Sequence, residues 1–99
     1  MTRDGYVFLN GRIVEAKRAT VSVYDRGLLY GDGLFETMRG YKGRAFAIEE
    51  HFHRLRTSAD ILGLPVPDLD WPAVITELLH KNGLQKQDTW VRLTITRGP

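Results

Sequence analysis

A two-residue turn near the amino terminus most strongly constrains how this chain can fold. Asn10 and Gly11 stand between two short apolar runs, at residues 6–9 and 13–14. Asn-Gly is the residue pair that best tolerates the positive φ angles of a two-residue hairpin turn. The sequence therefore predicts an antiparallel β-hairpin over residues 6–16.

A second hairpin is predicted over residues 34–48. Residues 41–44 supply turn chemistry between a strand at 34–41 and a second apolar run at 45–48. The first of these strands is mixed in polarity, with Phe35, Thr37, Arg39 and Tyr41 on one face and Leu34, Glu36 and Met38 on the other. We expect the two hairpins to share one sheet.

The apolar residues then recur with the period of a helix. Residues 49–62 place Phe52, Leu55, Ala59 and Leu62 on one side, with Gly63 as a cap. A second helix is predicted after Asp70, with Pro72 in its first turn, Gly83 beyond its end, and a buried side of Val74, Ile75, Leu78 and Leu79. Residues 89–96 alternate as a strand, with Val91, Leu93 and Ile95 on one face.

The order of these elements indicates an α+β fold. A hairpin, a glycine-rich loop at 21–33, a second hairpin, two helices and a strand follow one another without βαβ repeats. We therefore expect two hairpins in an antiparallel sheet packed with two helices. The 99 residues, 42% of them hydrophobic, suffice for one core and one domain, residues 1–99. Because the chain stops directly after a strand, we expect it to be cut from a longer protein.

Composition disfavours several classes of function. The 14 Lys and Arg residues exceed the 12 Asp and Glu residues by two and form no block of like charge, so binding to nucleic acid or to a membrane surface is not expected. The absence of cysteine excludes thiol nucleophiles and Cys-ligated metals. No signal-peptide pattern and no apolar run of about 18 residues occurs, so we expect a soluble, cytoplasmic domain.

Residues that could carry chemistry lie in two segments. In residues 30–39, glycines precede a strand with aromatic and cationic side chains, which suits ligand recognition, although Gly-Asp-Gly is also an ordinary turn. His51 and His53 point about 200° apart on a helix, so no metal site is expected. Arg54 either extends along the apolar helix face towards solvent or grips a phosphate or carboxylate with its planar fork.

Several separated motifs occur in the order typical of one family. They are Asp25-Arg26-Gly27, the run Tyr30 to Glu36, Arg39, Tyr41, Gly43, Glu50-His51, Arg54-Leu55 and Ser58-Ala59. Together they resemble the amino-terminal domain of fold-type IV, class IV pyridoxal-phosphate aminotransferases. This family includes branched-chain aminotransferases, D-amino-acid aminotransferases and 4-amino-4-deoxychorismate lyase. The resemblance covers essentially the whole chain, and it implies the small amino-terminal domain of D-amino-acid-aminotransferase-like enzymes.

The resemblance also implies ligands and their binding residues. It implies pyridoxal 5'-phosphate as cofactor, an amino acid and a 2-oxo acid as substrates, and a homodimer. By position, Arg54 matches the arginine that binds the cofactor phosphate, and the pocket candidates are Tyr30, Phe35 and Arg39. Trp90 and Arg92 fall where branched-chain aminotransferases carry an aromatic residue and a carboxylate-binding arginine. Those enzymes usually read Tyr-Ile-Arg-Pro, whereas residues 90–93 read Trp-Val-Arg-Leu, so an ordinary exposed strand arginine is an equal alternative for Arg92.

No lysine of the chain matches the family's catalytic position. In the family, the lysine that holds the cofactor and the carboxylate beside the pyridine nitrogen lie in the larger carboxy-terminal domain. The four lysines here are Lys17, Lys42, Lys81 and Lys86. We therefore expect residues 1–99 to hold no catalytic residue and to be inactive alone, and we expect the parent to be an aminotransferase, with branched-chain substrates favoured.

Other functions stay open at this point. Residues 35–39 also resemble some aminodeoxychorismate lyases, and the domain could serve as a stand-alone binding or assembly module. A nucleic-acid-binding protein would rest on ten arginines and ten aromatic residues.

Overall fold

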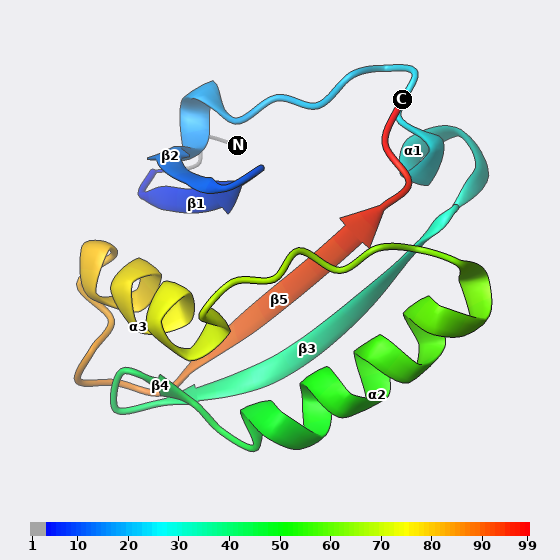
Figure 1. Ribbon diagram of the computed structural model, residues 1–99. Coiled ribbons are helices and arrows are strands. Elements are labelled where there is room, and N and C mark those ends of the chain that lie inside the picture. The colour runs from blue at the N-terminus through cyan, green and yellow to red at the C-terminus, as the bar shows by residue number, and fades with distance from the viewer. Residues whose placement is uncertain (1–3) are drawn as a thin grey trace.

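The computed structural model describes residues 4–99 as an α+β domain (Figure 1). In chain order its elements are β1 (Tyr6–Leu9), β2 (Arg12–Glu15), a 3-10 turn η1 (Ala16–Arg18), α1 (Arg26–Tyr30), β3 (Gly33–Tyr41), β4 (Arg44–Ala45), α2 (Ile48–Leu62), α3 (Trp71–Lys81) and β5 (Thr89–Thr96). The predicted fold class is confirmed. Among residues 4–99, no helix has the length and apolar character needed to cross a membrane.

Both predicted hairpin turns are present. Asn10 and Gly11 have φ angles of 50° and 92°, and Leu9 faces Arg12 across the turn. Lys42 and Gly43 make the equivalent turn between β3 and β4, with φ angles of 48° and 81°. Positive φ at both central residues gives a turn whose twist matches that of the flanking strands.

The expectation that the two hairpins share a sheet is wrong. Strands β1 and β2 form a two-stranded sheet, and β4, β3 and β5 form a second sheet in that order. The amide of Asn82, at the end of α3, occupies the free edge of β1: its Oδ1 accepts from Tyr6 N at 2.8 Å and its Nδ2 donates to Tyr6 O at 3.0 Å. A side chain thus satisfies backbone groups that a neighbouring strand would otherwise pair.

The predicted strand at residues 45–48 is also shorter than expected. Strand β4 ends at Ala45, because Ala47 takes a left-handed conformation with φ 57° and the chain turns directly into α2. Strand β5 replaces it as the main partner of β3, in an antiparallel register from Gly33 opposite Thr96 to Gly40 opposite Thr89.

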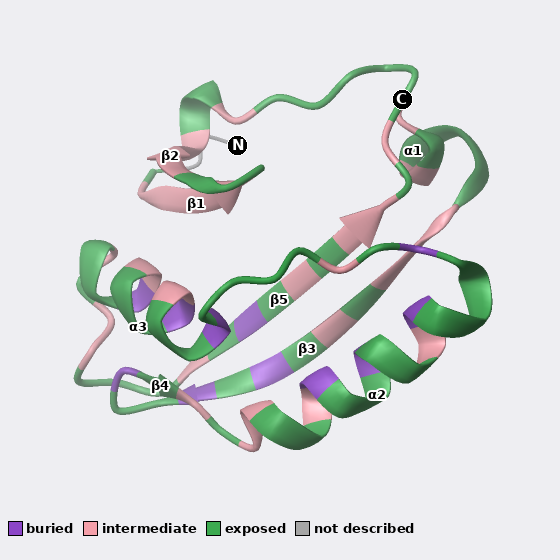
Figure 2. Ribbon diagram, viewed as in Figure 1, coloured by how far each residue is buried: buried purple, intermediate pink, exposed green. Residues whose placement is uncertain are grey.

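One face of the larger sheet carries the core. Helix α2 runs along β3, and α3 lies between β4 and the β1–β2 hairpin (Figure 1). The buried core consists of Met38, Phe52, Leu55, Trp71, Ile75, Leu79 and Val91. Trp71 joins the parts of the molecule, because its ring stacks on Phe52 at 5.4 Å and meets Phe8 of the hairpin edge-on at 6.0 Å. Along β3 and β5, exposed residues alternate with buried or half-buried ones (Figure 2), so the opposite face of these strands is exposed.

Two features of the helices differ from the sequence prediction. Leu62 is 44% exposed, because the chain reverses at Gly63 and Leu64, 4% exposed, takes the buried position instead. Helix α1 was not predicted, although Asp25 caps its amino terminus through Gly27 N and Gly31 ends it with φ 65°. An aspartate followed six residues later by a glycine is a capping pattern that predicts a short helix inside the glycine-rich segment.

Candidate functional site

Four of the six residues predicted to bind ligands lie together on the exposed face of the larger sheet. Phe35 and Arg39 come from β3, and Trp90 and Arg92 come from β5. The register places Arg39 opposite Trp90, and Arg92 opposite Thr37. Because side chains alternate along a strand, all four point away from α2 and α3. We call this surface, formed by Phe35, Arg39, Trp90 and Arg92, the outer face.

The two arginines of the outer face differ in their surroundings. Arg39 donates from Nη2 to Asp88 Oδ2 and forms an ion pair at 2.6 Å. The guanidinium of Arg92 lies 4.2 Å from the centroid of the Phe35 ring, a cation–π contact, and Nε is 3.5 Å from Thr94 Oγ1. No carboxylate within residues 4–99 forms an ion pair with Arg92. Of these two arginines, Arg92 therefore keeps its charge available for an anionic ligand.

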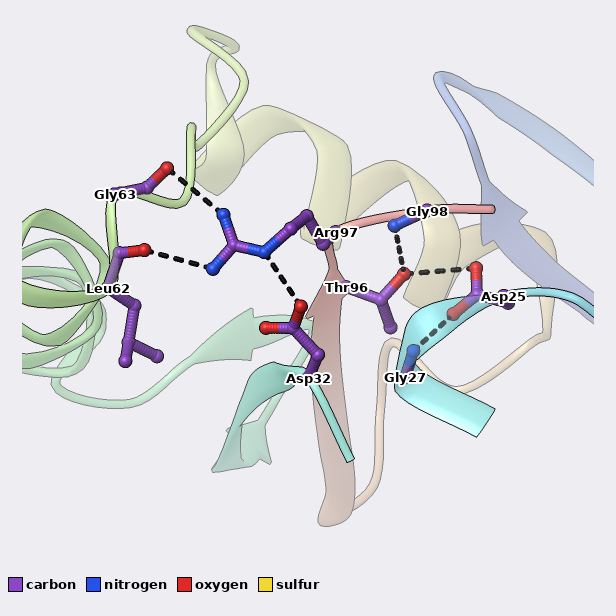
Figure 3. Close-up of polar contacts among 8 residues, drawn as sticks. All are labelled: Asp25, Gly27, Asp32, Leu62, Gly63, Thr96, Arg97 and Gly98. Atoms are coloured by element: carbon purple, nitrogen blue, oxygen red, sulfur yellow. Dashed lines mark hydrogen bonds and ion pairs between the residues drawn. The ribbon is translucent and has the colours of Figure 1, made fainter. Parts of the chain in front are cut away.

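Tyr30 lies at the end of α1 and is 73% exposed. Helix α1, which carries it, is fixed to the end of β5 by polar contacts at its first residues (Figure 3). Asp25 accepts hydrogen bonds from Gly27 N at 2.8 Å and from Thr96 Oγ1 at 3.0 Å. A Cβ atom at Gly27 would collide with Thr96 Cγ2, so only glycine permits this close approach. Helix α1 is thus held against β5, beside the carboxyl end of that strand.

Arg97 extends this network to α2. Its Nε donates to Asp32 Oδ2 at 2.7 Å, and its Nη1 and Nη2 donate to the carbonyl oxygens of Gly63 and Leu62 at 3.3 and 2.9 Å (Figure 3). The hydrogen bond to Asp32 raises the pKa of the Arg97 guanidinium. A cation at the carboxyl end of a helix satisfies carbonyl groups and opposes the helix dipole. The loop before β3 and the end of α2 are therefore joined through one side chain.

The sixth predicted residue, Arg54, lies apart from the outer face. It projects from α2 and holds Glu36 of β3 with two hydrogen bonds, from Nη2 to Oε1 at 2.7 Å and from Nε to Oε2 at 3.2 Å. His51 Nδ1 lies 2.7 Å from the same Oε1 atom. Glu36 alternates with Phe35 along β3, so its carboxylate is on the side of the strand that faces α2. Of the two histidines, His51 therefore turns towards the strand, whereas His53 is exposed.

The charge state of Glu36 follows from these contacts. Its side chain is only 12% exposed, and the hydrogen bond from Arg54 lowers the pKa of its carboxyl group, with a smaller opposing effect of burial. The same pair raises the pKa of the Arg54 guanidinium. Both groups are charged at neutral pH. The sequence left open whether Arg54 extends into solvent or binds a phosphate or a carboxylate. In the structure it binds a carboxylate of the chain itself, that of Glu36.

The donors that remain on Arg54 are compatible with a phosphate group. Guanidinium has five N–H donors, and Glu36 uses those of Nε and one of Nη2. Nη1 donates no hydrogen bond to any residue in the described part of the chain, and the side chain is 65% exposed. The donor set that a phosphate needs is thus present and accessible.

Comparison with known proteins identifies the family. A family model described as Amino-transferase class IV matches residues 33–99. The chain is 45% identical over 94 residues to a putative branched-chain-amino-acid aminotransferase of Methanocaldococcus jannaschii, covering 93% of this chain and 32% of that protein. It is 38% identical over 92 residues to a D-alanine aminotransferase of Staphylococcus haemolyticus, covering 89% and 32% of the two chains.

Solved structures agree. The branched-chain aminotransferase of Thermoproteus uzoniensis, determined with norvaline, has 34% sequence identity and a TM-score of 0.81, over 93% of this chain and 33% of that one. A hypothetical aminotransferase of Mycobacterium tuberculosis in its PLP-bound form has 32% identity and a TM-score of 0.80, over 94% and 34%. The chain belongs to the class IV aminotransferases, and it spans about a third of the length of these relatives.

Two partners of the predicted site residues were not identified from the sequence. Glu36 pairs with Arg54 across 18 residues, and Asp88 pairs with Arg39 across 49. A signal existed for Glu36, because an acidic residue stands between Leu34 and Met38 on the face that should be apolar. Asp88 had no such signal, since it precedes β5 at an exposed position outside any helix or strand.

Proposed function

We propose that this chain is the amino-terminal part of a pyridoxal-phosphate-dependent aminotransferase, which moves an amino group between an amino acid and a 2-oxo acid. Membership of the family supports this proposal, and so does the M. jannaschii relative, whose name favours branched-chain substrates. The observation that carries it is the outer face, where Arg92 offers an unneutralised cation beside the apolar rings of Phe35 and Trp90. None of the comparisons supports an aminodeoxychorismate lyase or a stand-alone module.

In this proposal Arg54 binds the cofactor phosphate. Paired donors on a planar fork suit phosphate oxygens, and charge-assisted hydrogen bonds of this kind are worth roughly 1.5–3 kcal/mol. Bound pyridoxal 5'-phosphate supplies the electron sink that stabilises negative charge at the α-carbon of the substrate. In this proposal none of the four exposed lysines holds the cofactor, and the lysine that does lies in the part of the relatives' length that this chain does not span.

The outer face binds the substrate in this proposal. Arg92 pairs with the α-carboxylate, because Asp88 already neutralises Arg39. Phe35 and Trp90, which are 58% and 74% exposed, offer apolar surface for an aliphatic side chain. Tyr30, the last residue of α1, is the remaining substrate-binding candidate in this proposal, and α1 is held near the carboxyl end of β5.

The test uses the complete enzyme and product analysis by chromatography. We expect amino transfer from L-leucine, L-isoleucine or L-valine to 2-oxoglutarate, and weaker transfer from D-alanine. Arg92→Ala should raise KM for the amino acid about 10- to 100-fold, the equivalent of its charge-assisted hydrogen bonds. Arg12→Ala, an exposed arginine on β2, is the matched control.

Three results would each argue against parts of this proposal. A preference for D-alanine would overturn the substrate class and leave the reaction type intact. Unchanged kinetics of the Arg92→Ala variant would show that Arg92 is an ordinary exposed strand arginine with no role in substrate binding. Release of pyruvate from aminodeoxychorismate without amino transfer from any amino acid would overturn the reaction itself.

A further inference from the structure

The carboxylate of Glu36 has no part in the function proposed above, yet it is the most completely enclosed charge that contacts a predicted site residue. Its side chain is 12% exposed and sits between two exposed neighbours on β3. A carboxylate in such a position is costly unless it is paired. Both of its partners, Arg54 and His51, come from α2, three residues apart on adjacent turns.

These contacts fix one edge of Arg54 and leave the other edge open. Glu36 holds Nε and Nη2, and His51 Nδ1 binds the same oxygen that receives Nη2, so the carboxylate is itself held in place. Nη1 makes no hydrogen bond within the described residues. Without Glu36, only the contact of Nη2 with His51 Nδ1, at 3.1 Å, would hold an arginine that is 65% exposed, so its side chain would sample more rotamers.

We propose that Glu36 is a positioning residue, which grips the Nε edge of Arg54 and presents the Nη1 edge to the cofactor phosphate. The inference rests on the proposed function, because it assumes that Arg54 binds phosphate. Glu36 touches no ligand and acts only through Arg54. Preorganisation of this kind raises affinity by removing the cost of ordering a long side chain on binding, about two- to tenfold for one such side chain.

The negative charge of Glu36 acts against this gain, since it repels a phosphate bound on the far edge of the guanidinium. This repulsion passes partly through solvent, where salt screens it: the Debye length is about 10 Å at 0.1 M salt and about 3 Å at 1 M. The orientation of Arg54 by direct hydrogen bonds depends much less on salt. Measurements at about 0.5 M NaCl therefore weaken the repulsion while leaving the positioning effect.

The experiment compares two ligands in the complete enzyme: pyridoxal 5'-phosphate, and pyridoxal, which lacks the phosphate. Dissociation constants are measured by fluorescence titration of the apoenzyme for the parent, Glu36→Gln, Arg54→Ala and the double variant. The glutamine amide of the first variant places a donor against a donor of Arg54, so the bidentate pairing is lost. Glu49→Gln and Arg56→Ala, on exposed positions of α2, are the matched controls.

We expect Glu36→Gln to weaken binding of pyridoxal 5'-phosphate about three- to tenfold and to leave binding of pyridoxal unchanged. In the Arg54→Ala background the same substitution should have no effect, because Glu36 then has nothing to position. Glu36→Asp, which keeps the charge on a shorter side chain, should restore part of the affinity. This variant also serves if Glu36→Gln does not fold.

Each other outcome identifies what is wrong. If Glu36→Gln binds pyridoxal 5'-phosphate as tightly as the parent, or if its effect persists without Arg54, the positioning role is overturned while Arg54 keeps its own. Equal loss for both ligands would show a general structural role for Glu36 and also overturn the inference. If Arg54→Ala leaves the affinity unchanged, the phosphate assignment in the proposed function fails, and the inference fails with it.

Discussion

Replacing Asn82 by alanine should loosen the attachment of the amino-terminal hairpin to the rest of the domain, leaving the packing of Phe8 on Trp71 to hold it. Asn82 makes three side-chain hydrogen bonds, two with the backbone of Tyr6 and one from Nδ2 to Leu78 O at 2.9 Å. Leu78 O also accepts a hydrogen bond from Asn82 N, at 3.1 Å. This carbonyl therefore keeps a donor in Asn82→Ala, and losing the bond from Nδ2 should reduce stability little. The cost lies in the two bonds to Tyr6, which among residues 4–99 are the hydrogen bonds that join that edge of β1 to α3.

The magnitude follows from those two bonds. A neutral hydrogen bond contributes about 1 kcal/mol net, and a partner left without a bond in a partly buried position adds to the loss. The free energy of unfolding should therefore fall by about 2–3 kcal/mol. For a domain of this size, each kcal/mol corresponds to roughly 4–8 °C, so Tm should fall by about 10–20 °C.

Urea unfolding followed by circular dichroism measures this loss, and hydrogen exchange locates it. The amide protons of residues 6–9 should exchange much faster in Asn82→Ala, whereas those of β3 and β5 keep their order of protection. Gln87→Ala, at an exposed position nearby, should change stability by no more than about 0.5 kcal/mol. The reasoning is refuted if Asn82→Ala matches this control and the exchange of residues 6–9 is unaltered.

Three further predictions concern charge, surface and lysine chemistry. Arg54 lowers the pKa of Glu36 below its ordinary 4.5, so the pair stabilises the fold fully above about pH 5 and loses this contribution as pH falls through the folded-state pKa. Glu36→Gln should therefore flatten the acid side of a curve of unfolding free energy against pH. An unchanged acid side would contradict this. The isolated chain should self-associate or bind a hydrophobic dye, since Tyr30, Phe35 and Trp90 are 73%, 58% and 74% exposed, and a clean, dye-free monomer in sedimentation at tens of micromolar would argue for a stand-alone module. Borohydride reduction of the isolated chain with pyridoxal 5'-phosphate should label its four exposed lysines to similar extents in mass mapping, and one dominant labelled lysine would disprove the expectation that none is catalytic.

Local sequence signals were sufficient for the local structure. A two-residue hairpin turn needs positive φ angles at both central residues, and Asn10 and Gly11 tolerate them better than most residue pairs. The hairpin could be predicted from this pair and the apolar runs beside it. The capping residues Asp70 and Gly63 marked helix ends in the same way. Each of these signals acts within a few residues of the structure that it determines.

Such local signals did not predict which strands and side chains pair over long distances in the sequence. The main partner of β3 is the final strand, whose paired residues lie 49 (Gly40 to Thr89) to 63 (Gly33 to Thr96) positions later in the chain. The edge of β1 is covered by an asparagine side chain rather than by a strand. The partners of Arg54 and Arg39 likewise come from other parts of the chain. The sequence therefore indicated that Arg54 could bind a carboxylate or a phosphate, but it did not identify Glu36 as that carboxylate. The grouping of Phe35, Arg39, Trp90 and Arg92 on one face needed the β3–β5 register, although each residue's own strand face was predictable from alternation.

The alternation along β3 and β5 also bears on how such a domain diverges. Met38 and Val91, which are buried, secure the fold, while their exposed neighbours Arg39 and Trp90 contribute little to the core. We expect substitutions on the outer face to leave stability within about 0.5 kcal/mol, far less than the roughly 2–5 kcal/mol typical of truncating a buried methionine or leucine. In the proposed function, where the outer face binds the substrate, a lineage can therefore sample new specificities one codon at a time without a prior stabilising change. Relatives named for branched-chain amino acids and for D-alanine, on one shared scaffold, are the outcome that such tolerance permits.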